Sequence, residues 1–144
     1  MKLEIVQNDQ QLKDAFYVRK TIFVQEQNVS IKEEIDEFEA ESTHFVLYND
    51  AAQPIGAGRV RFLDNYAKIE RICVLKELRN TGAGKLIMNA IEAFSLRNDI
   101  QFFKLNAQNH AICFYEKLGY KIVSEEFLDA GIPHHTMIKG TEDM

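Results

Sequence analysis

The sequence is poor in cysteine and in basic residues, and it contains no long apolar run. The only two cysteines, Cys73 and Cys113, lie in apolar segments rather than at the spacing of a disulfide framework or a metal site. This indicates a reducing compartment and gives no reason to expect a metal. The 17 lysines and arginines stand against 22 acidic residues, for a formal net charge of −5. Such a balance disfavours nucleic acid and anionic membranes as partners and would attract a cationic substrate.

No segment reaches the apolar length of a membrane span, and the first residues lack the apolar core of a signal peptide. We therefore expect a cytoplasmic protein with no membrane partner. With 144 residues, 46% of them hydrophobic, the chain has material for one core. Because no repeat, low-complexity tract or linker interrupts it, residues 1–144 are expected to form a single domain.

The hydrophobic pattern predicts strands alternating with helices, and therefore a mixed α/β layer fold. The stretch 25–41 holds seven acidic residues and one lysine, which predicts an exposed helix or a loop. Residues 140–144 are expected to be a frayed tail. Strands are predicted at residues 3–5, 45–48, 55–62, 68–74, 102–106, 120–123 and 136–139, and helices at 12–23, 84–94 and 111–118.

One loop carries the clearest chemical signal. Between the strand at 68–74 and the helix that begins near residue 84, the chain reads Arg79-Asn80-Thr81-Gly82-Ala83-Gly84. Two glycines let the backbone turn sharply, and the helix start presents N–H groups and a positive dipole end to an anion. This 79–84 loop is therefore predicted to bind a pyrophosphate, with Arg79 adding a charged contact.

Two common phosphate loops do not fit this sequence. A Walker loop needs serine or threonine after Gly84-Lys85, where the chain has Leu86. The dinucleotide fingerprint needs a third glycine at the position of Ile87. A nucleotide-binding protein is therefore disfavoured, and the remaining pattern is the Arg/Gln-x-x-Gly-x-Gly/Ala of an acyl-CoA loop.

A second motif follows at residues 111–120, where the chain reads AICFYEKLGY. With both motifs, the chain resembles the GNAT superfamily of acyl-CoA N-acetyltransferases. Residues 19–27, 105–108 and 127–134 resemble a bacterial branch described as YjcF-like or ElaA-like. The resemblance spans nearly the whole chain. It implies a six- or seven-stranded mixed sheet with about four helices, splayed so that the cofactor lies between the strands ending at Val74 and Asn106.

The resemblance also implies the reaction, which is direct transfer of the acetyl group of acetyl-CoA to a primary amine of a small molecule or peptide. Acetyl-CoA is then the cosubstrate, and no metal takes part. The superfamily suggests a homodimer. A non-catalytic acyl-CoA sensor or regulatory module stays open as the alternative, because binding CoA does not require transfer. The identity of the acceptor is not encoded in these motifs.

Tyr115 is the acid that the resemblance implies, protonating the departing CoA thiolate. The residue also shares a helical stripe with Phe114 and Leu118, so packing in the core is the other interpretation.

Glu70 is the corresponding candidate base, which would deprotonate the amine directly or through water. Strand alternation predicts that Glu70 shares one face with Ile72 and Val74 and lines the cleft. A cross-strand ion pair with Arg59 or Arg61 is equally consistent with the sequence.

The resemblance further implies backbone contacts to pantetheine from the strand before the loop. It also implies a side-chain contact from Gln108, where the superfamily often has asparagine, although capping of the next helix by Asn109 is the other interpretation. Cys73 is expected to be a core thiol, because direct transfer forms no acyl-enzyme. The predicted cofactor-binding residues are Ile72, Cys73, Val74, Arg79, Asn80, Thr81, Gly82, Ala83, Gly84, Lys85 and Gln108.

Two further predictions concern the acceptor. His134 is expected to line its site, although an ordinary loop histidine would look the same, and His134-His135 make a poor metal pair because adjacent extended residues point to opposite sides. Glu26, with Glu33 and Asp36, is expected to attract the amine. A solvated acidic face is the alternative.

Overall fold

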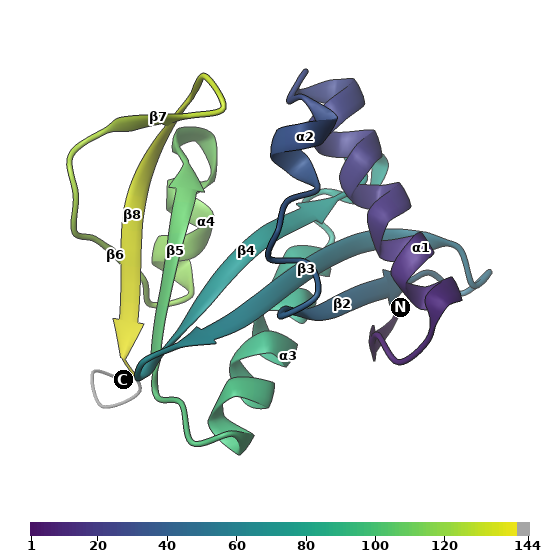
Figure 1. Ribbon diagram of the computed structural model, residues 1–144, viewed down its shortest axis with the longest axis horizontal. Coiled ribbons are helices and arrows are strands. Elements are labelled where there is room, and N and C mark those ends of the chain that lie inside the picture. The colour runs from purple at the N-terminus through teal and green to yellow at the C-terminus, as the bar shows by residue number, and fades with distance from the viewer. Residues whose placement is uncertain (141–144) are drawn as a thin grey trace.

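The computed structural model describes residues 1–140. Within them, eight strands form one mixed sheet in the order β1-β2-β3-β4-β5-β8-β6, with β7 paired to β8 (Figure 1). The elements are β1 (Lys2–Ile5), α1 (Asp9–Arg19), π-helical η1 (Lys20–Glu26), α2 (Ile31–Glu34), β2 (Thr43–Tyr48), β3 (Pro54–Leu63), β4 (Tyr66–Val74), 3-10 turn η2 (Lys76–Leu78), α3 (Ala83–Arg97), β5 (Phe102–Gln108), 3-10 turn η3 (Asn109–Ala111), α4 (Ile112–Lys117), β6 (Lys121–Ile122), β7 (Phe127–Asp129) and β8 (Ile132–Gly140).

The predicted mixed sheet with about four helices is confirmed, whereas the predicted number of strands is too low. The additional strand is β7, which pairs with β8 across a turn at Ala130 and Gly131. Leu128 in β7 is 70% exposed, so no buried apolar alternation marks this strand in the sequence. Gly140, expected in a frayed tail, is the last residue of β8, and the rest of that tail lies outside the described residues.

Helices cover both faces of the sheet. Phe45 of β2 packs with Ile87 and Ile91 of α3, whereas the next residue, Val46, packs with Val18 of α1. This alternation buries both faces and places β4 in the interior of the layered fold. None of the described helices is long and apolar enough to cross a membrane.

A β-bulge separates the two central strands. Arg71 has a φ of +61°, and the β3–β4 register shifts between Ala57 and Arg59 at the same level. Strand β5 runs parallel to β4 and pairs with it over Ala67–Ile69, beyond which the two strands diverge (Figure 1). This divergence agrees with the splay expected between the strands that end at Val74 and Asn106.

The bulge also changes the face on which Glu70 lies. Ile72 and Val74 pack in the core beside α3, whereas Glu70 bonds to Arg59 on the α1 side, where Cys73 packs. Because the bulge adds one residue to β4, the alternation of side chains restarts after it. The prediction that Glu70 shares a face with Ile72 and Val74 is therefore wrong.

The acidic stretch 25–41 is largely a partner for buried arginines. Glu34, 1% exposed, accepts hydrogen bonds from the buried Arg19 at 2.7 and 3.0 Å. Asp36 accepts two from the buried Arg59, both at 2.9 Å. Arg71, at the bulge, donates to Glu34 at 3.1 Å and to Asp36 at 3.2 Å. The predicted exposure is therefore wrong for Glu34 and Asp36, and the stretch fixes the bulge instead.

This network predicts a loss of stability in acid. Burial alone would raise the pKa of Asp36 and Glu39, but hydrogen bonds from Arg59 and Arg19 outweigh it and lower each pKa to about 2. Because each pKa is lower in the folded than in the unfolded protein, the two carboxylates stabilise the fold at pH values above their unfolded pKa values of 3.8 and 4.5. This contribution is lost as the pH falls toward 2. Asp36→Asn is expected to cost about 2 kcal/mol at pH 7 and to weaken the acid dependence.

Urea unfolding followed by circular dichroism from pH 7 to pH 2.5 measures this effect. Glu37→Gln is the matched control, since Glu37 is exposed. The same stability loss in both variants would show that the Asp36–Arg59 pair contributes nothing of its own.

Candidate functional site

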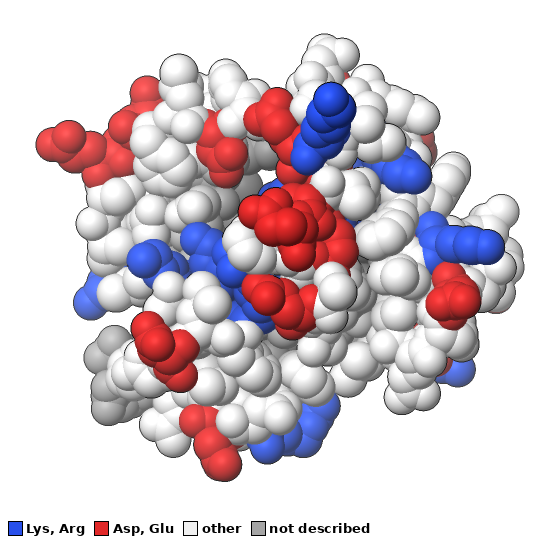
Figure 2. Space-filling model, viewed as in Figure 1, with Lys and Arg blue, Asp and Glu red and all other residues white. Residues whose placement is uncertain are grey.

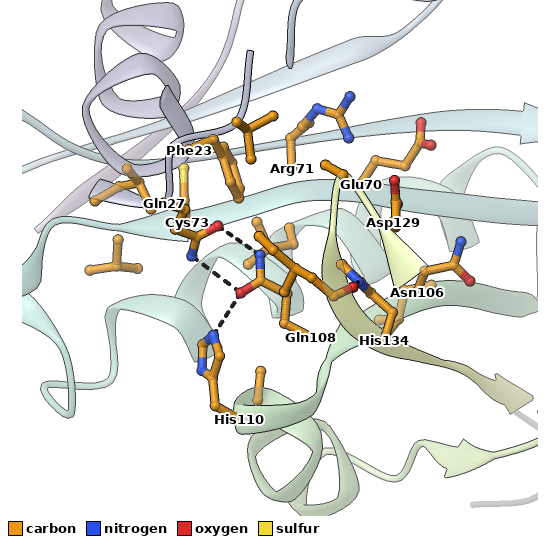
Figure 3. A pocket seen from close by; sticks show the side chains of 18 of the residues that line it. Phe23, Gln27, Glu70, Arg71, Cys73, Asn106, Gln108, His110, Asp129 and His134 are labelled. Carbon is orange, nitrogen blue, oxygen red and sulfur yellow. Dashed lines mark hydrogen bonds between the residues drawn. The ribbon is translucent and has the colours of Figure 1, made fainter. Parts of the chain in front are cut away.

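A pocket of about 540 Å³ opens where β4 and β5 diverge (Figure 3). Its walls come from both strands, α4, η1, the 79–84 loop and the β7–β8 hairpin. Thr81, Gly82, Ala83 and Lys85 lie beside it, in the loop and the first turn of α3. The other predicted site residues all line the pocket: Glu26, Glu70, Ile72, Cys73, Val74, Arg79, Asn80, Gly84, Gln108, Tyr115 and His134.

The 79–84 loop has the backbone of an anion-binding turn. Asn80 and Gly82 have φ values of +64° and +89°, and Gly82 is the N-cap of α3. In the described chain no side chain caps this helix, whose first hydrogen bond runs from Leu86 N to Gly82 O at 3.0 Å. The earlier N–H groups are available to a ligand. Gly84 is needed for packing, because a Cβ there would lie 3.0 Å from the Phe114 ring.

Arg79 connects this loop to η1. Its Nη2 donates to both carboxylate oxygens of Glu26, at 3.0 and 2.8 Å, and its Nε donates to the carbonyl of Val74 at 3.2 Å. Both side chains of the pair are more than one third exposed. Such a pair is weak, and a polyanion at the loop competes with Glu26 for Arg79.

Tyr115 enters the pocket from α4. The residue is 8% exposed, and its ring packs edge-on against Phe114 and Tyr120, with centroids 5.0 and 6.0 Å away. Within residues 1–140 its hydroxyl has no hydrogen-bond partner, and burial raises the pKa of this phenol. The side chain therefore packs through its ring and stays protonated at neutral pH.

Glu70 lines the pocket and is also an ion-pair partner. Its Oε1 accepts hydrogen bonds from Arg59 at 3.2 and 3.0 Å and from Arg61 at 2.9 Å. Burial would raise the pKa of Glu70, but the hydrogen bond from Arg61 and the charge of Arg59 outweigh it and lower the pKa. The ion pair that the sequence left open is present, and the carboxylate is ionised at neutral pH.

Cys73 faces α1 from the wall of the pocket. Burial raises the pKa of its thiol to about 12, so the thiolate is not populated near neutral pH. This environment suits a core thiol rather than a nucleophile.

Gln108 spans the divergence of the two strands. Its amide exchanges two hydrogen bonds with Gln27, the C-cap of η1, at 3.2 and 2.8 Å, and its Oε1 accepts one from His110 at 2.7 Å (Figure 3). The side chain of Asn109 bonds to Glu126 and His135 rather than to a helix end. The capping interpretation of Asn109 is therefore wrong.

His134 lines the pocket from β8. Its ring donates through Nδ1 to the carbonyl of Ile132 at 2.6 Å and stacks on Phe127, with ring centroids 5.9 Å apart. Within residues 1–140, no three His, Cys, Asp or Glu side chains form a group that would hold a metal.

Several polar residues of the lining were not singled out in the sequence. Lys68 and Asn106 carried a signal, because they alternate with buried residues on the pocket side of a strand, next to Glu70 and Gln108. Others come from loops and helix ends, where no periodicity applies, among them Gln27 and Asp129.

The comparison with protein families shows to which family the chain belongs. The family model described as an acetyltransferase (GNAT) domain matches residues 7–140. The chain belongs to this GNAT family. The resemblance inferred from the 79–84 loop and the 111–120 motif is therefore confirmed.

Known relatives of this GNAT chain place it in the YjcF-like or ElaA-like branch. It is 56% identical over 140 residues to the uncharacterized N-acetyltransferase YjcF of Bacillus subtilis, covering 96% of this chain and 99% of that protein. The structure of Escherichia coli ElaA matches with a TM-score of 0.84 at 23% identity, over 96% and 99% of the two chains.

A more distant structural match is an aminoglycoside 6'-N-acetyltransferase complexed with coenzyme A. Its TM-score is 0.77 at 16% identity, and the match covers 97% of each chain. At this level of identity, the similarity to this enzyme and to ElaA establishes the shared fold.

Proposed function

We propose that this GNAT protein transfers the acetyl group of acetyl-CoA directly to a primary amine of a small molecule or peptide. The supporting observation is that one pocket contains the open end of β4, the start of α3 with free N–H groups, and the hydroxyl of Tyr115. These are the three parts that acyl transfer from a thioester needs: an anion site, a carbonyl-polarising backbone and an acid.

In this proposal the pyrophosphate of acetyl-CoA binds at the 79–84 loop and at Lys85. Arg79 exchanges its contact with Glu26 for one with the ligand. The pantetheine arm runs along the backbone of Ile72, Cys73 and Val74, on the β4 segment that has left β5. The coenzyme A bound to the structurally similar aminoglycoside acetyltransferase supports this choice of ligand.

Gln108 is proposed to contact the pantetheine from the opposite side of the divergence. Its amide is already oriented by Gln27 and His110, so a ligand there replaces one of these partners.

The chemistry is a direct displacement. The amine nitrogen attacks the thioester carbonyl carbon, whose oxygen is polarised by the β4 backbone, and loses a proton. The carbon–sulfur bond then breaks, and Tyr115 gives its proton to the departing thiolate. The tyrosinate regains a proton from solvent, which leaves an amide and free CoA.

Glu70 is proposed to receive the proton of the amine through water. Its arginine hydrogen bonds all converge on Oε1. The low pKa of Glu70 makes it a weak base but keeps a full negative charge near the incoming ammonium group. Glu26 and His134 are proposed to line the path of the acceptor.

Residues 1–144 are proposed to form one catalytic domain, working in the cytoplasm as a homodimer without nucleic acid or membrane partners. Support comes from the GNAT match over residues 7–140 and from two free cysteines in the described chain.

Release of CoA from acetyl-CoA in the presence of a mixed amine library tests the function. The proposal predicts turnover with at least one amine. Micromolar binding of CoA with no turnover across polyamines, aminoglycosides, amino acids and peptides would instead favour the acyl-CoA sensor.

Gly82→Val is expected to weaken CoA binding at least about tenfold from a micromolar Kd, about −8 kcal/mol. A valine side chain disfavours the φ of +89° and projects from the turn that the pyrophosphate must approach. Calorimetric titration with CoA measures the affinity. Gly131→Val is the control, because Gly131 also has a positive φ and open space around its Cβ position. Equal CoA affinities in the two folded variants would contradict the prediction.

Glu70→Gln is expected to lower kcat/KM about tenfold at pH 7, with CoA affinity near that of the wild type. The defect should shrink as pH rises, because more of the amine is then already deprotonated. Asp36→Asn is the matched control: it also removes a carboxylate from Arg59 but lies outside the pocket lining. A pH-independent defect of equal size in both variants would assign Glu70 a structural role.

Tyr115→Phe is expected to reduce kcat by about 10², the lower end of the range for a lost acid, because a thiolate is already a fair leaving group. The ring and its packing remain, so the melting temperature should change little. Tyr120→Phe is the control, since this neighbouring hydroxyl donates to Glu92 at 2.7 Å and should affect stability rather than rate. Wild-type turnover in Tyr115→Phe would leave Tyr115 as a packing residue.

A further inference from the structure

Two lysines lie side by side on the parallel strands β4 and β5, just before these strands diverge. Lys68 of β4 and Lys104 of β5 are register partners, and Arg61 of β3 is opposite Lys68 on the other side. All three lie on the sheet face that carries Glu70 and Asn106, because side chains alternate along each strand before the bulge. Lys68 itself lines the pocket.

Among the described residues, the two lysines lack the carboxylate partners that the arginines on the same face of the sheet have. Arg59 and Arg61 both contact carboxylates within 3.0 Å. In the described part of the chain, neither Lys68 nor Lys104 has a carboxylate within 4.0 Å, and the Lys104 ammonium lies 5.5 Å from the centre of the Tyr66 ring. Figure 2 shows basic side chains gathered in the hollow between the β5–β8 strands and the lower part of β4.

This arrangement is unfavourable for the protein alone. Like charges directly opposite each other on neighbouring strands repel, and burial of a charge without a partner costs further free energy. Burial, the charge of Lys104 and that of Arg61 all lower the pKa of Lys68, against the attraction of Glu70 and Asp129. An anion bound between the lysines would offset both costs.

The position of Lys68 along β4 shows at which end of the pocket its charge lies. Lys68 precedes Glu70 by two residues, about 7 Å along the strand, on the side away from Val74 and the 79–84 loop. A ligand group at Lys68 therefore lies at the acceptor end of the pocket, beyond the proposed site of proton removal.

We infer that the acceptor carries an anionic group, a carboxylate or a phosphate, in addition to its amine, and that Lys68, supported by Lys104, binds this group. The inference rests on the proposed acetyl transfer and names its substrate class: amino acids or aminoalkyl phosphates rather than polyamines. The acidic excess of the whole chain does not decide the acceptor, because around Lys68 the three cations Lys68, Lys104 and Arg61 outnumber the two carboxylates Glu70 and Asp129.

Matched pairs of amines test the inference. CoA release is measured with glycine, β-alanine, 4-aminobutyrate and 6-aminohexanoate against their amides, and with phosphoethanolamine against ethanolamine. Rates are compared per concentration of neutral amine, because amides of α-amino acids have a lower amine pKa. The wild type is expected to prefer the anionic member of at least one pair by roughly 10- to 100-fold in kcat/KM. The carboxylate and phosphate series identify the anion.

Substitutions of the two lysines test whether they cause the preference for the anionic amine. Lys68→Gln should bring the preference close to one, Lys68→Arg should retain most of it, and Lys104→Gln should weaken it. Lys13→Gln, an exposed lysine on α1, is the control and should keep the wild-type preference. Equal rates for both members of every pair, or a preference that survives Lys68→Gln, would overturn the inference while leaving acetyl transfer intact.

A binding measurement separates the two proposals if no amine is turned over. Calorimetry with CoA present compares N-acetyl-β-alanine and N-acetyl-6-aminohexanoate with their amides, in the wild type and in Lys68→Gln. Tighter binding of the carboxylates by the wild type alone would support the anion site even without transfer. No difference between carboxylate and amide would reject it.

Discussion

The β-bulge at Arg71 is the constraint on which the rest of the site depends. Because β4 gains one residue there, its pairing with β5 ends at Ile69 and the next segment turns a free backbone edge toward the pocket. A continuous parallel pair would have filled that edge with strand hydrogen bonds and left no space for a ligand. The positive φ of Arg71 is strained for a residue with a Cβ, so other interactions must compensate for it.

Those interactions come from the acidic stretch between η1 and β2. Arg71 donates to Glu34 and Asp36, which also bind the buried Arg19 and Arg59. Removing one of these carboxylates leaves the buried Arg19 or Arg59 with fewer partners, which is costlier than losing a surface ion pair. The charge run that looked like a solvated face thus joins α1 to β3 and β4 and holds the bulge in place.

Much of the fold was predictable because its signals are local. The apolar stripe of α3, the glycines at 82 and 84 and the turn at Gly119 each depend on neighbours in the chain, and all appear where expected. The bulge was not predictable, since Arg71 is an ordinary strand residue in sequence and takes its conformation from Glu34 and Asp36, far away in the chain. The wrong prediction of the face on which Glu70 lies follows directly from the bulge. Strand β7 was missed because it is short and exposed, with no buried periodicity.

The lining of the pocket was predictable in part. The 79–84 loop was found because phosphate binding requires glycines at fixed spacing before a helix, and Tyr115 was found through the family resemblance of the 111–120 motif. Lys68 shares the strand alternation of Glu70, but its pairing with Lys104, like the contact of Gln27 with Gln108, depends on which strands and helices meet across the divergence. Cross-strand neighbours such as Lys68 and Lys104 are 36 positions apart in the printed sequence, and only the β4–β5 register joins them.

A crystal structure of the protein with CoA would show whether the divergence of β4 and β5 is an acyl-CoA site. We expect the pyrophosphate within about 3 Å of backbone N–H groups at residues 82–85. We also expect that Arg79 has left Glu26, that pantetheine lies along residues 72–74, and that the sulfur points to the Tyr115 hydroxyl. CoA bound elsewhere, with the Arg79–Glu26 pair and the pocket unchanged, would contradict this expectation.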